Sequence, residues 1–249
     1  MPFDLSGQEL SDAFASAWGV ARRHLQAVSD GRIAWLRANL HEPLITHLTF
    51  QVENQLFFVF VDVEGGLAWE RHLKQLFLDG AEAAGAHACR FPVVLSDDEA
   101  RTPRPEAAGW GLVDARSGDP VDPPALVSDA HIEMSDWEVH DIAVQIVRDQ
   151  MQQSGQKVES WQSYLGVFPA IWFDHGGQVG WVVVQAQRWP STDVTRKPDL
   201  DDIKTRFPGV GCFASAIVAN DDQDMDSLVP LPIYRGHPIR VSCSELGRL

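Results

Sequence analysis

Two nearly unbroken apolar runs constrain the fold of this chain more than any other feature. They are QLFFVFVDV at residues 55–63 and QVGWVVVQA at residues 178–186, and they lie 123 positions apart. A strand that is apolar at almost every position has to be covered on both faces, so each run is expected near the centre of a sheet. A shorter apolar segment and a polar turn precede each run, which predicts that both runs are second strands of hairpins.

The features around these runs recur in one order. A Ser/Gly step, a tryptophan and a proline eight residues later appear in 29–45 and again in 154–171, so Trp35 pairs with Trp161 and Pro43 with Pro169 at an offset of 126. Two later matches have offsets of 124 and 118, and they are 92–99 with 216–223 and 117–121 with 235–239. This order predicts an internal duplication, with chance resemblance between two ordinary halves as the alternative. The predicted units are 1–125 and 126–249.

Each half is predicted to be an α+β unit with the order helix, three strands, helix, two strands. The sheets are expected to be mainly antiparallel, with the helices packed on them. Ser135 and Glu138 have the spacing of a capping box and place the start of one helix, and Asp199 is expected to cap another. The remaining elements are predicted at 32–36, 68–84, 88–95 and 110–115 in the first half, and at 157–161, 199–207, 211–219 and 231–242 in the second.

Charge narrows the classes of partner. The formal net charge is −15, from 20 Lys and Arg against 35 Asp and Glu. Because such a surface repels phosphate backbones, nucleic acid is not expected as a partner. No apolar run approaches the ~20 residues that cross a bilayer, and no secretory signal begins the chain, so we expect no membrane association and a cytoplasmic location. The three cysteines form no CxxC pair, and we expect no metal and no cofactor.

The order of elements resembles the core of restriction-endonuclease-like nucleases. In that family an Asp and a Glu-x-Lys step on the central hairpin bind a divalent metal. In this sequence Ala170 follows Pro169 where the acid would stand, and Gln185 and Gln187 occupy the Glu-x-Lys positions. The resemblance therefore implies a degenerate or atypical metal-dependent hydrolase, with Glu138, Asp174, Gln185 and Gln187 at its centre. In the first half the corresponding step is Asp62-Val63-Glu64.

The order and the acidity also resemble the small chaperones of bacterial secretion systems. That similarity implies a binding role without catalysis, and this is the function that we expect. Trp172, Trp189 and Arg235 are the predicted binding residues, because aromatic and arginine side chains are enriched at interfaces. Another protein or a small molecule is the expected partner, with a homodimer as a further option. Asp222, Asp224 and Asp226 alternate as calcium ligands do, but they lack the later Glu of such a site and are expected to form a solvated acidic turn.

Overall fold

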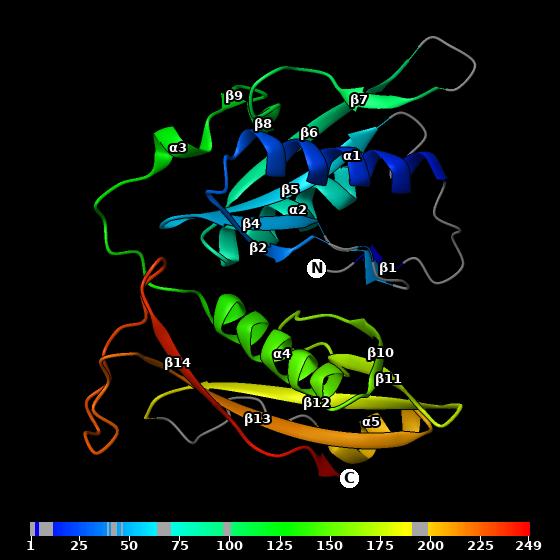
Figure 1. Ribbon diagram of the computed structural model, residues 1–249, viewed down its shortest axis with the longest axis vertical. Helices are drawn as coiled ribbons and strands as arrows, with labels where there is room; N and C mark the ends of the chain where they lie inside the picture. The colour runs from blue at the N-terminus through cyan, green and yellow to red at the C-terminus, as the bar shows by residue number, and fades with distance from the viewer. Residues whose placement is uncertain are drawn as a thin grey trace. The chain divides into compact units, whose positions relative to one another are not determined.

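The computed structural model describes residues 3–4, 12–38, 40, 44–45, 47–63, 71–96, 101–190 and 199–249. The chain divides into two compact units, Met1–His131 and Ile132–Leu249. The fold is α+β, and each unit is built on one mixed sheet (Figure 1). None of the described helices is long and apolar enough to cross a membrane.

The first unit has a seven-stranded sheet with the strand order β2-β4-β5-β6-β8-β9, and β7 also pairs with β6. Its helices are α1 (Asp12–Val28), α2 (Arg71–Ala83) and the short α3 (Pro123–Leu126). The strands of this sheet are β2 (Ile33–Arg37), β4 (Leu48–Val52), β5 (Gln55–Val63), β6 (His87–Leu95), β7 (Pro103–Pro105), β8 (Leu112–Asp114) and β9 (Pro120–Val121). Two further short strands, β1 (Phe3–Asp4) and β3 (Leu44–Ile45), pair with each other.

The second unit has a six-stranded sheet with the order β10-β11-β12-β13-β14, and β15 also pairs with β13. Its helices are α4 (Asp136–Gln153) and α5 (Leu200–Arg206). The strands are β10 (Lys157–Trp161), β11 (Ile171–His175), β12 (Gln178–Arg188), β13 (Val210–Asn220), β14 (Ile239–Cys243) and β15 (Gly247–Arg248). Figure 1 shows α4 over one face of this sheet and α5 on the other.

The two apolar runs are the central strands β5 and β12, as predicted. In the second unit, Val182 and Val184 of β12 pack towards α4, whereas Trp181 and Val183 pack in a cluster with Ile203 of α5. Because β12 is buried on both faces, the side chains in its middle, from Trp181 to Val184, are all apolar. In the first unit, ring contacts place α1 and α2 on opposite faces of the sheet, since His24 contacts Phe91 and Phe77 contacts Phe60.

The two units pair their central strands in one register. In the first unit Phe57 of β5 lies beside His87 of β6 in a parallel pair, a separation of 30 positions. In the second unit Gly180 of β12 lies beside Val210 of β13, again in parallel and again 30 positions apart. Each residue of the second pair lies 123 positions after its counterpart in the first pair.

The same offset of 123 extends to the outer strands. The first unit has a bulge between Trp35 and Arg37, and the second has one between Val158 and Ser160. On the other side, β6 pairs with β7 through Val93 and with β8 through Cys89. β13 pairs with β14 through Ala216 and with β15 through Cys212, at the positions 123 residues later. Duplication of one ancestral unit would produce this correspondence.

Some of the predicted matches were wrong in detail. The register makes Trp35 equivalent to Val158 and not to Trp161, so the predicted offset of 126 does not hold between β2 and β10. The offset between β6 and β13 is 123 and not the predicted 124. The match of 117–121 with 235–239 joins strands that are not equivalent, because β9 pairs with β8 and β14 with β13. Pro43 and the predicted helix start at 68–70 lie outside the described residues.

Candidate functional site

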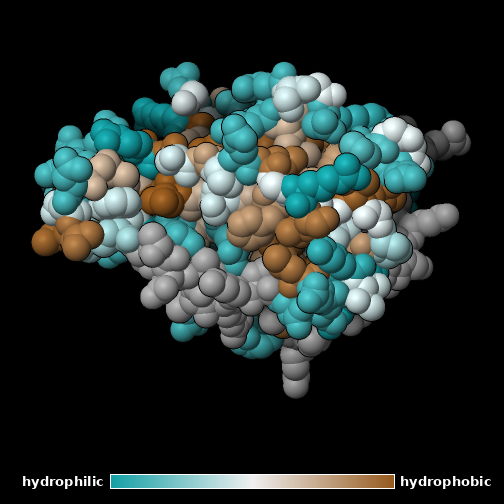
Figure 2. Space-filling model, turned by 90° about the horizontal axis from the view of Figure 1, so that it is seen from below, coloured by the Kyte–Doolittle hydropathy of each residue, from teal (hydrophilic) through white to brown (hydrophobic). Residues whose placement is uncertain are grey.

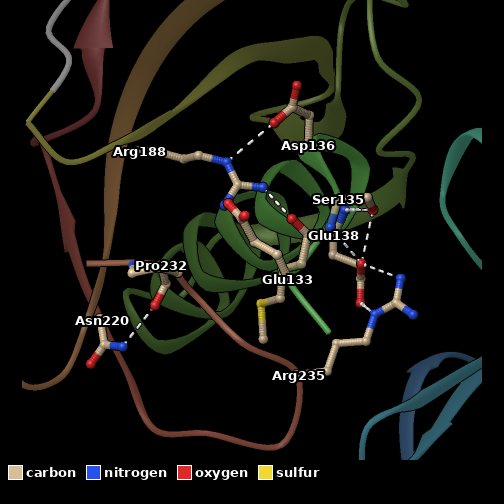
Figure 3. Close-up of polar contacts among 9 residues, drawn as sticks. Glu133, Ser135, Asp136, Glu138, Arg188, Asn220, Pro232 and Arg235 are labelled. Atoms are coloured by element: carbon tan, nitrogen blue, oxygen red, sulfur yellow. Dashed lines mark hydrogen bonds and ion pairs between the residues drawn. The ribbon is translucent and has the colours of Figure 1, made fainter. Parts of the chain in front are cut away.

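A buried ion pair in the second unit joins the start of α4 to the segment before β14. Nε of Arg235 donates to Oε1 of Glu138 at 2.8 Å, and its Nη2 donates to Oε2 of Glu138 at 2.8 Å. Arg235 is 3% exposed and Glu138 is 1% exposed. Such a bidentate pair is directional and fixes both side chains. We call Glu138 and Arg235 the clasp (Figure 3).

Glu138 also takes part in the N-terminal cap of α4. Its Oε2 accepts hydrogen bonds from the backbone N and Oγ of Ser135, at 2.7 and 2.8 Å, while the Ser135 hydroxyl accepts from the Glu138 backbone N–H at 3.3 Å. This is the capping box that the sequence predicts. Both oxygens of the Glu138 carboxylate therefore have partners within the fold. Oε2 accepts from Ser135 and Arg235, and Oε1 accepts from Arg235.

A second arginine, Arg188, holds the same end of α4. It lies at the end of β12 and contacts Asp136 through Nε at 3.2 Å and Glu133 through Nη1 at 3.4 Å, while its Nη2 donates to the backbone oxygen of Met134. Figure 3 shows Arg188 reaching the chain just before α4 on one side and Arg235 reaching Glu138 on the other. The two arginines thus fix residues 133–138 against the sheet.

Backbone hydrogen bonds complete this arrangement. The N–H of Met134 donates to the oxygen of Ile233 at 2.8 Å, and the N–H of Arg235 donates to the oxygen of Ile132 at 2.9 Å. A β-bridge joins Glu133 and Tyr234 between them. The residues after position 232 are therefore anchored to the start of α4.

These anchors hold one end of a structured loop, residues 221–232, which we call the docking loop. Gln223 is 4% exposed and lies inside the loop. Its side-chain amide donates to the backbone oxygens of Asp224 and Val229 at 2.8 and 3.2 Å, and its Oε1 accepts from the N–H of Leu231 at 2.7 Å. One buried side chain therefore ties together both arms of the loop.

Residues at or just after the ends of the neighbouring strands bond to the loop, one at its base and one near its tip. Nδ2 of Asn220 donates to the oxygen of Pro232 at 2.8 Å, a contact drawn in Figure 3. The indole N–H of Trp189 donates to the oxygen of Ser227 at 3.1 Å. Because the loop backbone is bonded at its base and in its interior, its tip is held in one conformation.

The tip presents apolar side chains to solvent. Of the eight large hydrophobic side chains that are exposed among the described residues, four lie in this loop, and they are Met225, Leu228, Val229 and Leu231. Leu228 is 80% exposed and Val229 is 72% exposed. Figure 2 shows hydrophobic side chains on a projection at its left edge, the side on which the β13–β14 connection lies in Figure 1. A concentration of exposed apolar surface on an ordered loop is typical of an interaction site.

Acidic residues border the apolar tip. The loop contains four aspartates at 221, 222, 224 and 226, and it contains no lysine or arginine. Asp224 uses Oδ1 to accept the backbone N–H of Asp226 at 3.0 Å, as in an ordinary turn. Among the described residues, no three His, Cys, Asp or Glu side chains are grouped as a metal site would require. The acidic turn predicted for Asp222, Asp224 and Asp226 is thus one arm of the docking loop.

The residues expected under the hydrolase alternative do not come together. Glu138 lies in α4 and is occupied by the clasp, whereas Gln185 lies on the opposite face of β12, the face that alternation shares with Trp181 and Val183. Asp174 caps the β11–β12 turn by accepting the N–H of Gly177 at 2.7 Å. Gln187 follows Gln185 on the same face, and both side chains are amides without charge. These four side chains form no common centre.

The predicted binding residues also have structural roles. Arg235 is neither in solvent nor in a cleft, because it is buried against Glu138. Trp172 is half-buried and packs in the cluster of Trp181 on the α5 face. Trp189 is half-buried and hydrogen-bonded to the docking loop. Arg235 therefore anchors the segment after the loop, and Trp189 bonds to the loop beside Leu228.

The sequence prediction of a strand at 231–242 is wrong for Leu231, and Met225, Leu228 and Val229 lie between predicted elements, where no pattern marks them as a site. β14 begins at Ile239, and the residues before it form the end of the loop and its anchor. The signal was available in the sequence LVPLP, since two prolines remove backbone donors and disfavour a central strand. Large apolar residues beside prolines, directly after a run of aspartates, indicate an exposed loop and not a core strand.

Comparison with known proteins places the loop and the clasp within a recognised family region. Residues 137–249 match the family model of a domain of unknown function, DUF8840. This match begins at the second residue of α4 and includes Glu138, the docking loop and Arg235. Searches of curated proteins and of solved structures found no match.

Proposed function

We propose that this protein acts by binding another protein, without catalysis, and that the docking loop of the second unit makes the contact. The partner is a protein whose apolar cleft is bordered by lysine and arginine. Leu228 and Val229 enter the cleft, and the aspartates at 222, 224 and 226 face the basic border. The observation that carries this proposal is the exposure of Leu228 and Val229 on a loop that Gln223 holds in place.

The order of the loop favours binding energetically. A loop that is already in its bound conformation avoids the entropy that a flexible segment would lose on association. Burial of two such apolar side chains contributes about 1.5–3 kcal/mol each when it is complete. An interface of this kind concentrates its affinity in a few central residues, which are surrounded by a polar rim.

Charge favours a basic partner over a second copy of the chain. The net charge is −15, and three of the aspartates that contribute to it, at 222, 224 and 226, lie in the loop without an ion pair to any described residue. Two copies that met through their loops would bring eight carboxylates together, which opposes self-association. A basic partner gains from the same charges, and its rate of association increases at low salt.

The test is reconstitution with a purified partner. Proteins that are retained from an extract of the source cells by the full chain are purified, and their affinities are measured by calorimetry at several salt concentrations. We expect a basic partner whose affinity decreases as salt increases, and the double substitution Leu228→Asp and Val229→Asp should weaken binding by about tenfold or more.

The matched control is Val179→Asp, which places the same charge on another exposed valine, near the start of β12. Val179 is 60% exposed and lies outside the docking loop, so its substitution should leave the affinity unchanged. Equal loss of binding in the control and in the loop variant would contradict the proposal. So would a partner that binds the loop variant as tightly as the native protein, or self-association that the loop variant abolishes.

A further inference from the structure

The strand β14 forms a free edge of the second sheet. It comes last in the strand order β10-β11-β12-β13-β14, and it pairs with β13 in an unbroken antiparallel register. Within the part of the chain that the structure describes, no strand pairs with its other side. An edge of this kind offers a row of backbone donors and acceptors to a strand from elsewhere.

The hydrogen bonds to β13 fix which backbone groups of β14 point outwards. The N–H of Ser244 donates to the oxygen of Ser215, which lies opposite it, at 2.8 Å. Opposite residues in an antiparallel pair alternate between bonded and non-bonded positions, so Ser242 and Arg240 also bond to β13. The three remaining residues of the strand direct their N–H and C=O groups along the free edge, and they are Ile239, Val241 and Cys243.

The equivalent edge of the first unit is protected by prolines. β7 pairs with β6 as β14 pairs with β13, so Pro103 takes the position of Val241 and Pro105 takes that of Cys243. The same alternation of hydrogen bonds places both prolines at outward positions. A proline has no N–H to offer an added strand, and proteins commonly use it to prevent pairing at an edge. β14 lacks this protection.

The opposite edge of the second sheet is protected in another way. β10 has a bulge between Val158 and Ser160, and it carries an ion pair of Lys157 with Glu159. Bulges and charged side chains both hinder the addition of a strand. β14 has no bulge, and its only charged residue is Arg240. Of these two edges, β14 is therefore the one that can accept a strand.

We infer that a second copy of this chain adds its own β14 antiparallel to this edge, around a two-fold axis at Val241, so that two six-stranded sheets become continuous. In this register Val241 bonds to Val241 of the other copy and Ile239 bonds to Cys243, so outward groups meet outward groups at every pair. These three apolar side chains are half-buried, and the added strand covers them further. On the other face, Arg240 lies opposite Ser242 and not opposite a second arginine.

This inference concerns β14 and does not depend on the docking loop. The loop precedes β14 in the chain, so antiparallel pairing places the two loops at opposite ends of the joined strands. The contact is small, and two chains with a net charge of −15 repel each other, so the dimer is weak. Added salt screens this repulsion and should strengthen the dimer, whereas it should weaken the binding of a basic partner to the loop.

The experiment measures the molar mass of the full chain by sedimentation velocity over a range of concentrations. We expect a reversible dimer with a dissociation constant on the order of 10 µM. Val241→Pro removes an outward N–H but no bond to β13, as Pro103 does in the first unit, and should weaken the dimer by about tenfold or more. Circular dichroism verifies that the variant folds, and Cys243→Pro is a second variant that should act in the same way.

The register is tested with cysteine variants under mild oxidation, with the native chain as the background. A mixture of Arg240→Cys and Ser242→Cys chains should form a disulfide between copies, and neither variant should do so efficiently alone. The double substitution Leu228→Asp and Val229→Asp should leave the dimer unchanged, which separates this inference from the proposed function.

A native chain that is monomeric at every concentration, a dimer that Val241→Pro leaves intact, or a dimer that the loop variant abolishes would overturn the inference. So would disulfides that either cysteine variant forms equally well alone. A monomeric native chain that retains a foreign protein, which Val241→Pro releases, would also overturn it, since the edge would then accept a strand of that protein.

Discussion

At the scale of single residues, the clasp is a buried ion pair with two hydrogen bonds between its side chains. Removing two charges from water is costly, and here the cost is offset by two hydrogen bonds between Arg235 and Glu138 and by the two that Ser135 gives to Glu138. A buried pair of this kind adds little net stability but strongly penalises the loss of one partner. It therefore specifies where the segment after the docking loop is attached.

Breaking the clasp from one side should be severe. Arg235→Met leaves a buried carboxylate, and Glu138→Gln leaves a buried guanidinium, so each is expected to lower the free energy of unfolding by about 3–5 kcal/mol. The double variant should lose less than the sum of the two single losses, because neither charge then remains unpaired. Urea unfolding measures all three values. Arg206→Met, which removes an exposed pair with Asp202, should cost at most about 0.5 kcal/mol, and an equal cost would contradict this account.

His47 makes stability depend on pH. Burial in the first unit holds the pKa of this imidazole well below its ordinary value of 6.5, and its ring stacks on Phe58 with centroids 3.8 Å apart. Above pH 6.5 the ring is neutral in both the folded and the unfolded chain. Below pH 6.5 the unfolded chain takes up a proton that the folded chain excludes, so stability falls as the pH falls.

The free energy of unfolding therefore has a slope against pH, to which His47 is expected to contribute at most about 1.4 kcal/mol per pH unit below pH 6.5. Urea unfolding at pH 5, 6, 7 and 8 measures it in the native chain and in His47→Gln, which cannot titrate in this range. The difference between the two slopes should appear below pH 6.5 and vanish above it. Identical slopes would show that His47 is not the group that titrates.

At the scale of elements, the docking loop is ordered by its interior. Replacing Gln223 with alanine removes three hydrogen bonds and leaves backbone groups of Asp224, Val229 and Leu231 without this partner. We expect a loss of about 1–3 kcal/mol in unfolding free energy and faster amide exchange between 224 and 231. Hydrogen-exchange mass spectrometry measures the second effect. Gln152→Ala, on the exposed side of α4, should change neither, and a loop that exchanges as before would contradict the role of Gln223.

Most elements could be predicted from sequence because local chemistry determines them. Ser135 and Glu138 placed the start of α4, and Asp199 caps α5 by accepting the N–H groups of Asp201 and Asp202. The apolar runs placed β5 and β12, because only a strand covered on both faces has that composition. These signals depend only on residues that are close in sequence, and the elements lie where the signals predict them.

The candidate site could not be predicted in the same way, because it depends on contacts that are distant in sequence. The sequence marks Glu138 as a helix-capping residue and Arg235 as a binding residue, and 97 positions separate them. Nothing in either local sequence indicates that one will be buried against the other. Trp189 likewise reaches the loop only because β12 pairs with β13, and Gln223 acquires its role only when the loop folds back on itself.

At the scale of the whole molecule, the two units share one strand register but differ in the residues at equivalent positions. Equivalent positions carry Asp62 and Arg90 in the first unit and Gln185 and Phe213 in the second. The connection after β6 leads to β7, which carries Pro103 and Pro105, whereas the connection after β13 is the docking loop and leads to β14. A common framework with different loops is how one fold supports different binding sites.

The central claim is that the docking loop is the surface through which the protein meets its partner. The most direct measurement is photo-crosslinking in the source cells, with a benzophenone amino acid placed at Leu228 in one strain and at Val179 in another. The account predicts that position 228 yields an adduct with a basic protein and that position 179 does not. An adduct at 179 alone, the same adduct at both positions, or an adduct at 228 only with a second copy of the chain would contradict it.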